Sequence, residues 1–395
     1  MKSKAVPSSD SGDRARTLNI AIVGCGQIAD AHLQELSKIS GVTTVATCDA
    51  HLDLAMQAAK RFAVPRYYDD VSTMLRVERP DIVHIATPAQ THMPLARHCM
   101  EAGAHVYIEK PLALDAAEVR EILSASQSLG RKVCVGHDQL YDPAWLDLRR
   151  RVARGEIGKV RHVESVLGYP ISAQFGSVVR GDSEHWVRKL PGGLFQNTIS
   201  HPLYRITEFL VDERPPLIAR WWSRTDLDFP TELLVHLRGR EVTGTLTFAT
   251  GIAAQRVTRV YGEKGMFEVN LDAQTVLHMA PAKLPGAFAK LEAPYRRSRE
   301  AARSWRRNAW RFLRSDIHYF AGMRHLFELF QQSVRDDTRP LPVEPGEMLR
   351  VTRIMDDIFA ECRSGDERKA PAPRDESKVA RMPESFSLST AARPA

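Results

Sequence analysis

The sequence predicts an α/β protein whose first half is a doubly wound parallel sheet. Its second half is predicted to be an α+β domain with a large, mostly antiparallel open sheet. Up to about residue 138, short β-branched runs alternate with helical stretches, as in a parallel sheet with helices on both faces. Beyond that point, β-rich segments follow one another with short turns between them, which is typical of antiparallel pairing. A chain of 395 residues is also long for one ordinary core, so two domains are expected.

The first half begins at Leu18, where polar residues give way to the apolar run LNIAIVG. Such a run suits a strand that is buried on both faces. Right-handed crossovers through the intervening helices make the sheet doubly wound. The predicted strands are 18–24, 43–49, 81–88, 104–111 and 132–137, and the predicted helices are 28–40, 52–62, 93–102 and 116–129.

The second half begins with a helix predicted over 143–154. Six β-rich segments follow, and Gly262 and Gly265 mark a hairpin turn between the last two. Helices over 317–335 and 345–362 end the folded part. The predicted strands are 160–169, 216–224, 232–239, 241–250, 256–265 and 266–271.

Composition argues against several classes of protein. No apolar run approaches the roughly 20 residues that a helix needs to cross a bilayer, and the first residues lack the apolar core of a secretory signal. The five cysteines lie mostly in apolar patterns, so we expect reduced thiols and a cytoplasmic protein. No cluster of cysteine and histidine has the spacing of a metal site, and no metal is expected.

The net charge of +7 is concentrated in residues 296–314, which contain eight arginines and one acid. The rest of the chain is near neutral, so a nucleic-acid partner is not expected. Ala302, Trp305, Ala309 and Phe312 recur at helical spacing. Two interpretations stay open: a helix that is solvated or packed through Trp305 and Phe312, or a patch for anionic lipid or the diphosphate of a nucleotide sugar.

A glycine-rich turn, GCGQIA at 24–29, follows the first predicted strand and opens the first helix. Gly24 permits the tight turn, Gly26 lets the backbone approach a pyrophosphate, and a small residue at position 29 lets helix and strand pack closely. Gln27 and Ile28 begin the helix, whose N–H groups and dipole favour phosphate. The pattern predicts a dinucleotide site.

Asp49 ends the second predicted strand, where a carboxylate can accept hydrogen bonds from an adenosine ribose. The same carboxylate would repel the 2′-phosphate of NADP, so NAD is favoured over NADP as the cofactor. Asp49 could also cap the helix that follows it, and the two roles are compatible.

Further motifs make a family recognisable. TPAQTH (87–92) and EKP (109–111) follow the third and fourth predicted strands, and GEIGKV (155–160) and HWVRKLPGGLFQNTISH (185–201) lie in the second half. Together with GCGQIA, they resemble the glucose–fructose oxidoreductase, inositol dehydrogenase and MocA (Gfo/Idh/MocA) family from about Leu18 to Cys362.

The resemblance implies an NAD(P)-binding Rossmann domain over 18–138 and an α+β substrate and oligomerisation domain over 139–362, with the basic insertion at about 283–314. It also implies hydride transfer between a nicotinamide cofactor and a hydroxyl-bearing carbon of a sugar, nucleotide sugar or cyclitol. We expect a homo-oligomer. Residues 1–17 and 363–395, which are polar and rich in charge, are predicted to be disordered.

By the family's pattern, Lys110 is the central catalytic lysine, and His201 is the proton-transferring histidine. The ammonium of Lys110 would stabilise an alkoxide as hydride leaves. Asn197, four residues before His201, stands where the family usually has an aspartate, and the spacing places both side chains on one helix face. An amide cannot take a proton, so His201 is expected to work without a carboxylate beside it.

The resemblance also places Thr87, Pro88, His92, Glu109 and Lys110 at the cofactor, with Glu109 orienting Lys110 or the cofactor ribose. His92 could instead only help begin the next helix. At 137–138, at the ligand edge of the sheet, the chain has His-Asp where the family more often has Asn-Arg, so the substrate contacts are expected to differ there. An alternative function, favoured by Asn197, is a non-catalytic regulatory protein that binds dinucleotide and sugar.

Overall fold

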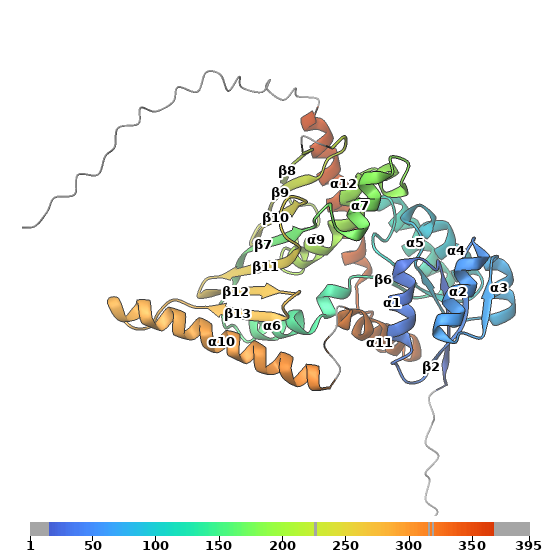
Figure 1. Ribbon diagram of the computed structural model, residues 1–395, viewed down its shortest axis with the longest axis horizontal. Helices are drawn as coiled ribbons and strands as arrows, with labels where there is room; N and C mark the ends of the chain where they lie inside the picture. The colour runs from blue at the N-terminus through green and yellow to red at the C-terminus, as the bar shows by residue number, and fades with distance from the viewer. Residues whose placement is uncertain (1–15, 225–226, 315–316, 318–319, 367–395) are drawn as a thin grey trace, which may run out of the picture.

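The computed structural model describes residues 16–224, 227–314, 317 and 320–366, and two β-sheets organise them (Figure 1). The first sheet is parallel, in the order β3-β2-β1-β4-β5-β6. The strand order reverses between β1 and β4, which is the place where doubly wound sheets bind ligands. The strands are β1 (Leu18–Val23), β2 (Val42–Cys48), β3 (Arg66–Tyr68), β4 (Ile82–Ile85), β5 (His105–Ile108) and β6 (Val133–Val135), and the helices are α1 (Gln27–Leu36), α2 (Leu52–Phe62), α3 (Val71–Glu78), α4 (His92–Glu101) and α5 (Ala116–Leu129).

All five strands predicted for the first half are present, and the sequence missed one strand and one helix there. β3 has only three residues and is largely exposed, so it has no apolar run to reveal it. α3 buries only Met74 and Leu75, and it begins where the Asp70 side chain accepts the N–H of Thr73 at 2.7 Å. Both elements lie at the edge of the sheet, where little burial is required.

The second sheet has seven strands in the order β13-β12-β11-β7-β10-β9-β8. Every neighbouring pair is antiparallel except β7 and β10, so the predicted fold class is confirmed. β13 was not predicted, because its five residues follow β12 after a short turn and are mostly half-buried. The strands are β7 (Val160–Gly168), β8 (Leu217–Trp222), β9 (Glu232–Arg238), β10 (Thr243–Ala249), β11 (Gln255–Gly262), β12 (Gly265–Asn270) and β13 (Thr275–Met279).

Helices cover one face of the second sheet. Burial along β9 alternates residue by residue between a core face and a solvent face. α9 contacts β7, and α12 contacts β8, on the covered face. The helices of this half are α6 (Pro143–Ala153), α7 (Gln174–Gly181), α8 (Gly193–Thr198), α9 (Ser200–Thr207), α10 (Ala287–Leu313), α11 (Ala321–Arg335) and α12 (Pro345–Asp366), with short 3-10 helices η1 (Ala89–Thr91), η2 (Asp138–Tyr141) and η3 (Trp186–Lys189).

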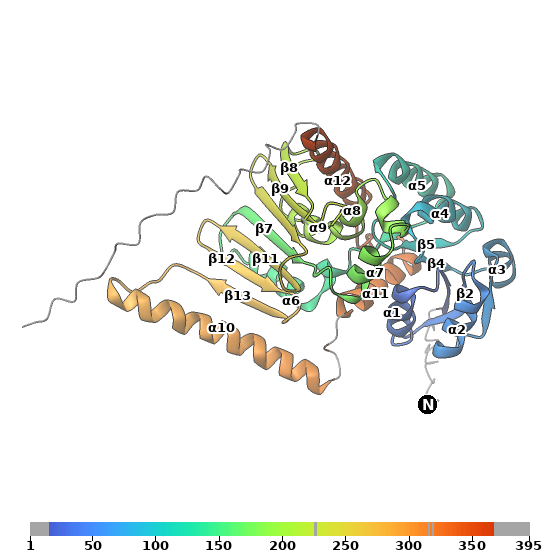
Figure 2. The same ribbon diagram turned by 45° about the horizontal axis from the view of Figure 1, so that its top comes forward.

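The basic segment forms α10, a long helix that lies along the outer edge of the second sheet beside β13 (Figures 1 and 2). The interpretation that Trp305 and Phe312 pack this helix onto the fold is wrong. These two residues are 69% and 71% exposed, respectively. No described helix is both long and apolar enough to cross a bilayer.

The last two helices join the halves of the molecule. α11 contacts α1, although it lies far along the chain, and α12 contacts both α5 and β8. The predicted split at residue 138 therefore describes the two sheets, whereas the helices after residue 320 serve both. The segments predicted to be disordered fall mostly outside the described residues, and residues 363–366 continue α12.

Candidate active site

The candidate residues gather where the carboxyl edge of the first sheet meets the second half of the chain. Lys110 follows β5, and Asp138 begins η2 after β6. Asn197 lies in α8 and His201 in α9, two short helices that lie between the sheets (Figure 2). This edge also holds the turn between β1 and α1, so the predicted cofactor and catalytic residues meet at the expected end of the parallel strands.

The two glycines of the turn are required for different reasons. Gly24 has a φ of +92°, and a Cβ there would approach the backbone of Ala86 to 2.7 Å, so a side chain would collide with the loop after β4. Gly26 precedes the first turn of α1, and a Cβ on it would meet no atom within 4 Å. The space beside Gly26 is open, as a pyrophosphate on the helix N-terminus requires. Exposed Gln27 and half-buried Ile28 begin the helix.

Asp49 connects β2 to this turn. Its carboxylate accepts the N–H of Cys25 at 2.8 Å and the N–H of His51 at 2.9 Å. Asp49 is not the N-cap of α2, because that helix begins at Leu52 after His51. A carboxylate can accept about four hydrogen bonds, so Asp49 keeps lone pairs for a ribose diol.

His92 is a structural link rather than a free ligand group. It is buried as the first residue of α4, with Nε2 at 2.8 Å from the carbonyl oxygen of Thr87 and Nδ1 at 3.0 Å from that of Pro111. Burial lowers the pKa of His92, although the carbonyl partners raise it in part. The ring thus holds the Thr87–Pro88 loop against the loop that carries Lys110.

Glu109 belongs to a buried network under the site. Its carboxylate lies 2.9 Å from His32 Nε2 and accepts the backbone N–H of Lys110 at 3.2 Å. His32 Nδ1 lies 3.1 Å from Nδ1 of His84, whose pKa is strongly lowered by burial. Burial raises the pKa of Glu109, but the hydrogen bond from His32 and the charges of His32 and Lys110 bring it below its ordinary value. Glu109 is therefore an ionised residue that orients the Lys110 backbone.

Lys110 reaches across the domain junction to α8. Its Nζ donates to the backbone carbonyl of Asn197 at 3.0 Å. Burial lowers the pKa of Lys110, while the negative charges of Glu109 and Asp138 raise it in part. An ammonium has three donors, so the bond to Asn197 leaves others for a substrate oxygen.

The expectation that Asn197 and His201 share one helix is wrong. The helix is interrupted at Ile199, so Asn197 ends up in α8 and His201 in α9. Pro202 has no N–H to offer the carbonyl four residues before it, which favours this break. Asn197 contributes its carbonyl oxygen, and that oxygen serves Lys110 rather than continuing a helix.

His201 does have a carboxylate nearby, contrary to the sequence expectation. Its Nδ1 lies 2.7 Å from the hydroxyl of Tyr204 and 3.8 Å from Asp138. The Tyr204 hydroxyl accepts the N–H of Gln139 at 3.2 Å and donates to Asp138 at 3.3 Å. A phenol can accept two hydrogen bonds and donate one, so every position is used if His201 Nδ1 carries its proton. Nε2 of His201 is then the basic nitrogen.

The titration of the cluster follows from burial. Burial and the positive charge of Lys110 lower the pKa of His201 strongly, so the ring is neutral near pH 7. Burial and the negative charge of Glu109 raise the pKa of Asp138 to about 7. The His137 ring packs against the Tyr204 ring with centroids 4.5 Å apart and planes tilted by 33°, and burial lowers the pKa of His137 to about 3. The arrangement holds a neutral base, an ammonium and a carboxylate near its titration point within one site.

The sequence identified Lys110 and His201 and placed Asp138 at the ligand edge of the sheet, but it gave no role to Tyr204 or His32 and did not link Asp138 to His201. The signal for Tyr204 was its i, i+3 spacing from His201, which places the two side chains on one face of a helix. Asp138 directly follows a strand of the parallel sheet, and strand ends meet at one edge. His32 sits among apolar helix residues, so its link to Glu109 could not be read from local pattern.

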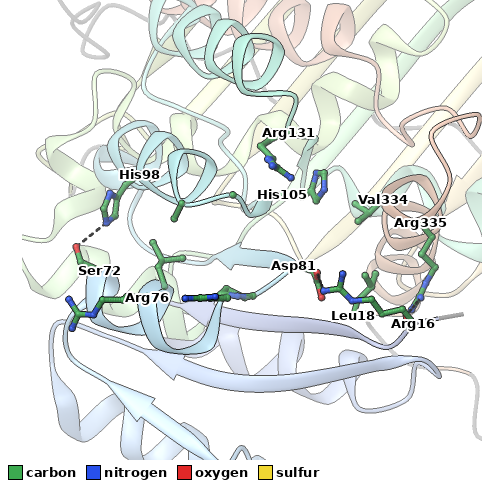
Figure 3. Close-up of a pocket in the computed structure, with 15 residues that line it drawn as sticks. Arg16, Leu18, Ser72, Arg76, Asp81, His98, His105, Arg131, Val334 and Arg335 are labelled. Carbon is green, nitrogen blue, oxygen red and sulfur yellow. Dashed lines mark hydrogen bonds and ion pairs between the residues drawn. The ribbon is translucent and has the colours of Figure 1, made fainter.

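A separate cavity of about 910 Å³ lies at the opposite edge of the first sheet (Figure 3). Leu18 begins β1 there, and Asp81 immediately precedes β4, so this is the amino edge of the strands. The labelled lining includes Arg16, Arg76, Asp81, His98, His105, Arg131 and Arg335. None of the cofactor or catalytic candidates faces this cavity.

Two family models match the chain. Residues 18–137 match an oxidoreductase family with an NAD-binding Rossmann fold, and residues 145–268 match the GFO/IDH/MocA C-terminal domain. D-Glucoside 3-dehydrogenase of Escherichia coli (strain K12) is 30% identical over 144 residues, which are 36% of this chain and 41% of that protein. Inositol 2-dehydrogenase of Gluconacetobacter diazotrophicus is 35% identical over 154 residues, or 38% and 45%. The chain thus matches less than half the length of these two relatives.

Solved structures share the whole architecture at low identity. GenD2 from gentamicin A biosynthesis, in complex with NAD, has a TM-score of 0.70 at 18% identity and covers 92% of this chain and 98% of its own. The WlbA dehydrogenase from Bordetella pertussis, in complex with NADH and UDP-GlcNAcA, has a TM-score of 0.68 at 17% identity, covering 89% and 96%. At these identities the likeness establishes the fold alone.

Proposed function

The chain belongs to the Gfo/Idh/MocA family of oxidoreductases, and from this premise we propose that it transfers hydride between a nicotinamide cofactor and a hydroxyl-bearing carbon of a sugar, nucleotide sugar or cyclitol. One observation supports this most directly. Lys110 and the His201–Tyr204–Asp138 chain meet at the carboxyl edge of a Rossmann sheet, the edge that also holds the glycine turn. A cationic donor and a neutral base on one reacting hydroxyl are what alcohol oxidation requires.

The residues of the turn fit a dinucleotide. The open space at Gly26 and the N-terminus of α1 would hold the pyrophosphate, and Asp49 would hold the adenosine ribose. Because the Asp49 carboxylate would oppose a 2′-phosphate, we assign NAD rather than NADP as the cofactor. A bound nicotinamide ring supplies the hydride acceptor.

Lys110 and His201 have distinct roles. Lys110 donates to the substrate oxygen with the N–H groups that Asn197 leaves free, and it stabilises negative charge as the hydroxyl loses its proton. His201 takes that proton at Nε2. The resulting imidazolium is stabilised by Asp138 through Tyr204, with the direct distance from Nδ1 only 3.8 Å. Tyr204 and Asp138 act through His201 and are positioning residues.

The alternative of a non-catalytic binding protein depended on Asn197. Because Asn197 has no carboxylate, α8 offers His201 no negative charge to stabilise its protonated form. A protein that only binds its ligands could tolerate this loss. Asp138 supplies a carboxylate from the first sheet instead, so the geometry favours an enzyme. We infer the substrate class from the relatives, which are named as dehydrogenases of glucosides and of inositol. The homo-oligomer stays a prediction.

A screen for NADH formation tests the proposal. The protein is incubated with NAD and free sugars, nucleotide sugars or inositols, and Lys110→Ala serves as the matched control. We expect turnover with one of these classes and a loss on the order of 10²–10³-fold in the variant, because it lacks the group that stabilises the oxyanion. Its NAD affinity should change no more than a few-fold. Tight NAD binding without turnover on any substrate would favour the regulatory alternative, and a fully active variant would remove Lys110 from the mechanism.

A further inference from the structure

The amphipathic pattern of α10 is inverted relative to an ordinary surface helix. A helix on a folded domain normally turns its apolar face to the core and its polar face to water. In α10, Ser304 is the buried residue. Leu291, Trp305 and Phe312 are 71%, 69% and 71% exposed, respectively.

Polar contacts attach the inner face of α10 to the second sheet and α6. Arg307 donates to Asp147 and to the carbonyl of Gln274, each at 2.8 Å. Arg151 of α6 donates to Glu300 at 2.7 Å, and Ser304 bonds to the backbone of β13. The orientation of the helix is therefore fixed by specific bonds, and the apolar face points outward because of them.

The outer face has two adjacent stripes, which we call the apolar stripe and the arginine stripe. In a helix with 3.6 residues per turn, each residue advances by about 100°, and this rotation places the apolar stripe on one side of α10. Its large exposed members are Phe288, Leu291, Tyr295, Trp305, Phe312 and Leu313. The arginine stripe beside it consists of Arg299, Arg303 and Arg306. Within the described chain, no acidic side chain pairs with these three arginines.

We propose that the outer face of α10 docks the protein on a membrane surface that contains anionic lipids. Aromatic and aliphatic side chains on one side of a helix, with arginines beside them, are the pattern of helices that lie in the plane of a bilayer interface. The apolar stripe would enter the boundary between headgroups and acyl chains, and the arginine stripe would contact lipid phosphates. The surface is additional to the proposed oxidoreductase site, and neither family model extends to α10.

Charge complementarity favours lipid over a second copy of the chain. If two copies met through this face, their arginine stripes would come together, and like charges oppose such contact. An anionic lipid surface offers the opposite charge along the whole helix. Since no described helix could cross a bilayer, the contact would be peripheral.

Vesicle sedimentation with the full chain tests this docking. The probes are vesicles of phosphatidylcholine alone and vesicles that also contain phosphatidylglycerol. We expect binding to the anionic vesicles, weaker binding to the neutral ones, and loss of binding as salt is raised. Failure to bind anionic vesicles at low salt would overturn the proposal.

Paired variants separate the two stripes. The double variant Trp305→Ser with Phe312→Ser should weaken binding at every salt concentration, because it removes inserted apolar surface. Arg303→Gln with Arg306→Gln should weaken binding at low salt by roughly five-fold per arginine. The matched controls change exposed residues elsewhere: Ile218→Ser with Trp222→Ser on β8, and Arg76→Gln with Arg238→Gln on α3 and β9. Controls that lose binding as strongly as the α10 variants would contradict a specific surface.

Sedimentation equilibrium without lipid tests the other occupant. We expect the variants on α10 and the wild-type protein to have the same mass. A different result would assign α10 to an interface between copies of the chain. In that case the wild-type protein would have a larger mass than the double variant Trp305→Ser with Phe312→Ser, and the wild-type protein would not bind vesicles. NADH formation, where the substrate screen provides it, should be unchanged in all four double variants, so failure of the docking proposal and of the proposed activity can be distinguished.

Discussion

A carboxylate supports a histidine by its distance and protonation state, whichever element it comes from. In this chain, Asn197 removes the carboxylate from α8, and Asp138 brings one to 3.8 Å of His201 from the end of β6. A carboxylate from Asp138 differs in one respect from a carboxylate on α8. Asp138 is half-buried near Glu109, and its pKa is raised to about 7, so its charge changes within the working range of pH.

This titration predicts the pH dependence of substrate oxidation. The ionised form of Asp138 stabilises the imidazolium that His201 forms, so kcat/KM should rise as pH increases through about 7. His201 should not cause this rise, because burial and Lys110 keep its pKa well below the ordinary value. Asp138→Asn should remove the rise near pH 7 and lower kcat/KM on the order of 10²-fold. His201→Ala should be at least as severe.

The measurement is the pH profile of kcat/KM for the wild type and the two variants, with NAD affinity as the control. An Asp138→Asn profile that still rises through pH 7 would assign the titration to another group. An unchanged profile in His201→Ala would leave Lys110 alone to carry the chemistry.

Asp49 gives a second prediction for a single residue. Its carboxylate is held by the N–H groups of Cys25 and His51, so it cannot easily turn away from a 2′-phosphate. We expect the protein to bind NAD(H) more tightly than NADP(H). Asp49→Asn should reduce this difference in affinity, because it removes the charge repulsion between the carboxylate and the 2′-phosphate. Calorimetric titration with both cofactors measures this. Equal affinities in the wild-type protein would contradict the role given to Asp49.

Helices and strands whose apolar residues recur with a regular period were predicted correctly. Short strands at the edge of a sheet and the interruption of a helix were not. α2 and α5 have the predicted bounds because each presents a regular buried face to the sheet. β3 and β13 bury too little to be recognised from pattern. The break between α8 and α9 was missed as well. Its consequence, a carbonyl of Asn197 turned to Lys110, depends on a residue 87 positions away.

Two single substitutions in the β1–α1 turn are expected to have different effects. Gly24→Ala should destabilise the fold by about 1–3 kcal/mol or more, because Gly24 has a positive φ and a Cβ would collide with Ala86. Gly26→Ala should leave stability nearly unchanged, since its Cβ would meet no atom. Gly26→Ala should nevertheless weaken NAD binding, because the Cβ occupies space needed by the pyrophosphate.

Denaturant unfolding and NAD titration of the two variants separate these effects. If both variants were destabilised equally and both bound NAD normally, the turn would have only a geometric role. If Gly26→Ala bound NAD as well as the wild type, the pyrophosphate would have to lie elsewhere.

Over the whole molecule, the two halves share one continuous core. α11 inserts Phe327 among rings of the first sheet and α1, with centroid distances of 5.1 Å to His32, 4.7 Å to His84 and 4.8 Å to Tyr107. His32 in turn bonds to Glu109 beneath Lys110. The C-terminal part of the chain thus completes the packing of the cofactor domain. The sequence could not show this, because the apolar period of α11 reveals a buried face but not its partner.

Phe327→Ala should therefore weaken the cofactor domain although residue 327 lies outside it. Phe327 is fully buried, and removing a buried phenylalanine costs about 3–5 kcal/mol. Hydrogen exchange should show lost protection in β1, β4 and β5 as well as in α11, because these strands lie under the same cluster of rings. Phe248→Ala, at a similarly buried phenylalanine on β10, is the control and should affect the second sheet first.

If Phe327→Ala left exchange in β1, β4 and β5 at wild-type rates, the first sheet would be stable without α11. If both variants exposed both sheets equally, the molecule would unfold only as one unit. The expected pattern, in which each variant loosens its own sheet first, would show that His32, Glu109 and the Lys110 loop depend for their support on a helix near the end of the chain.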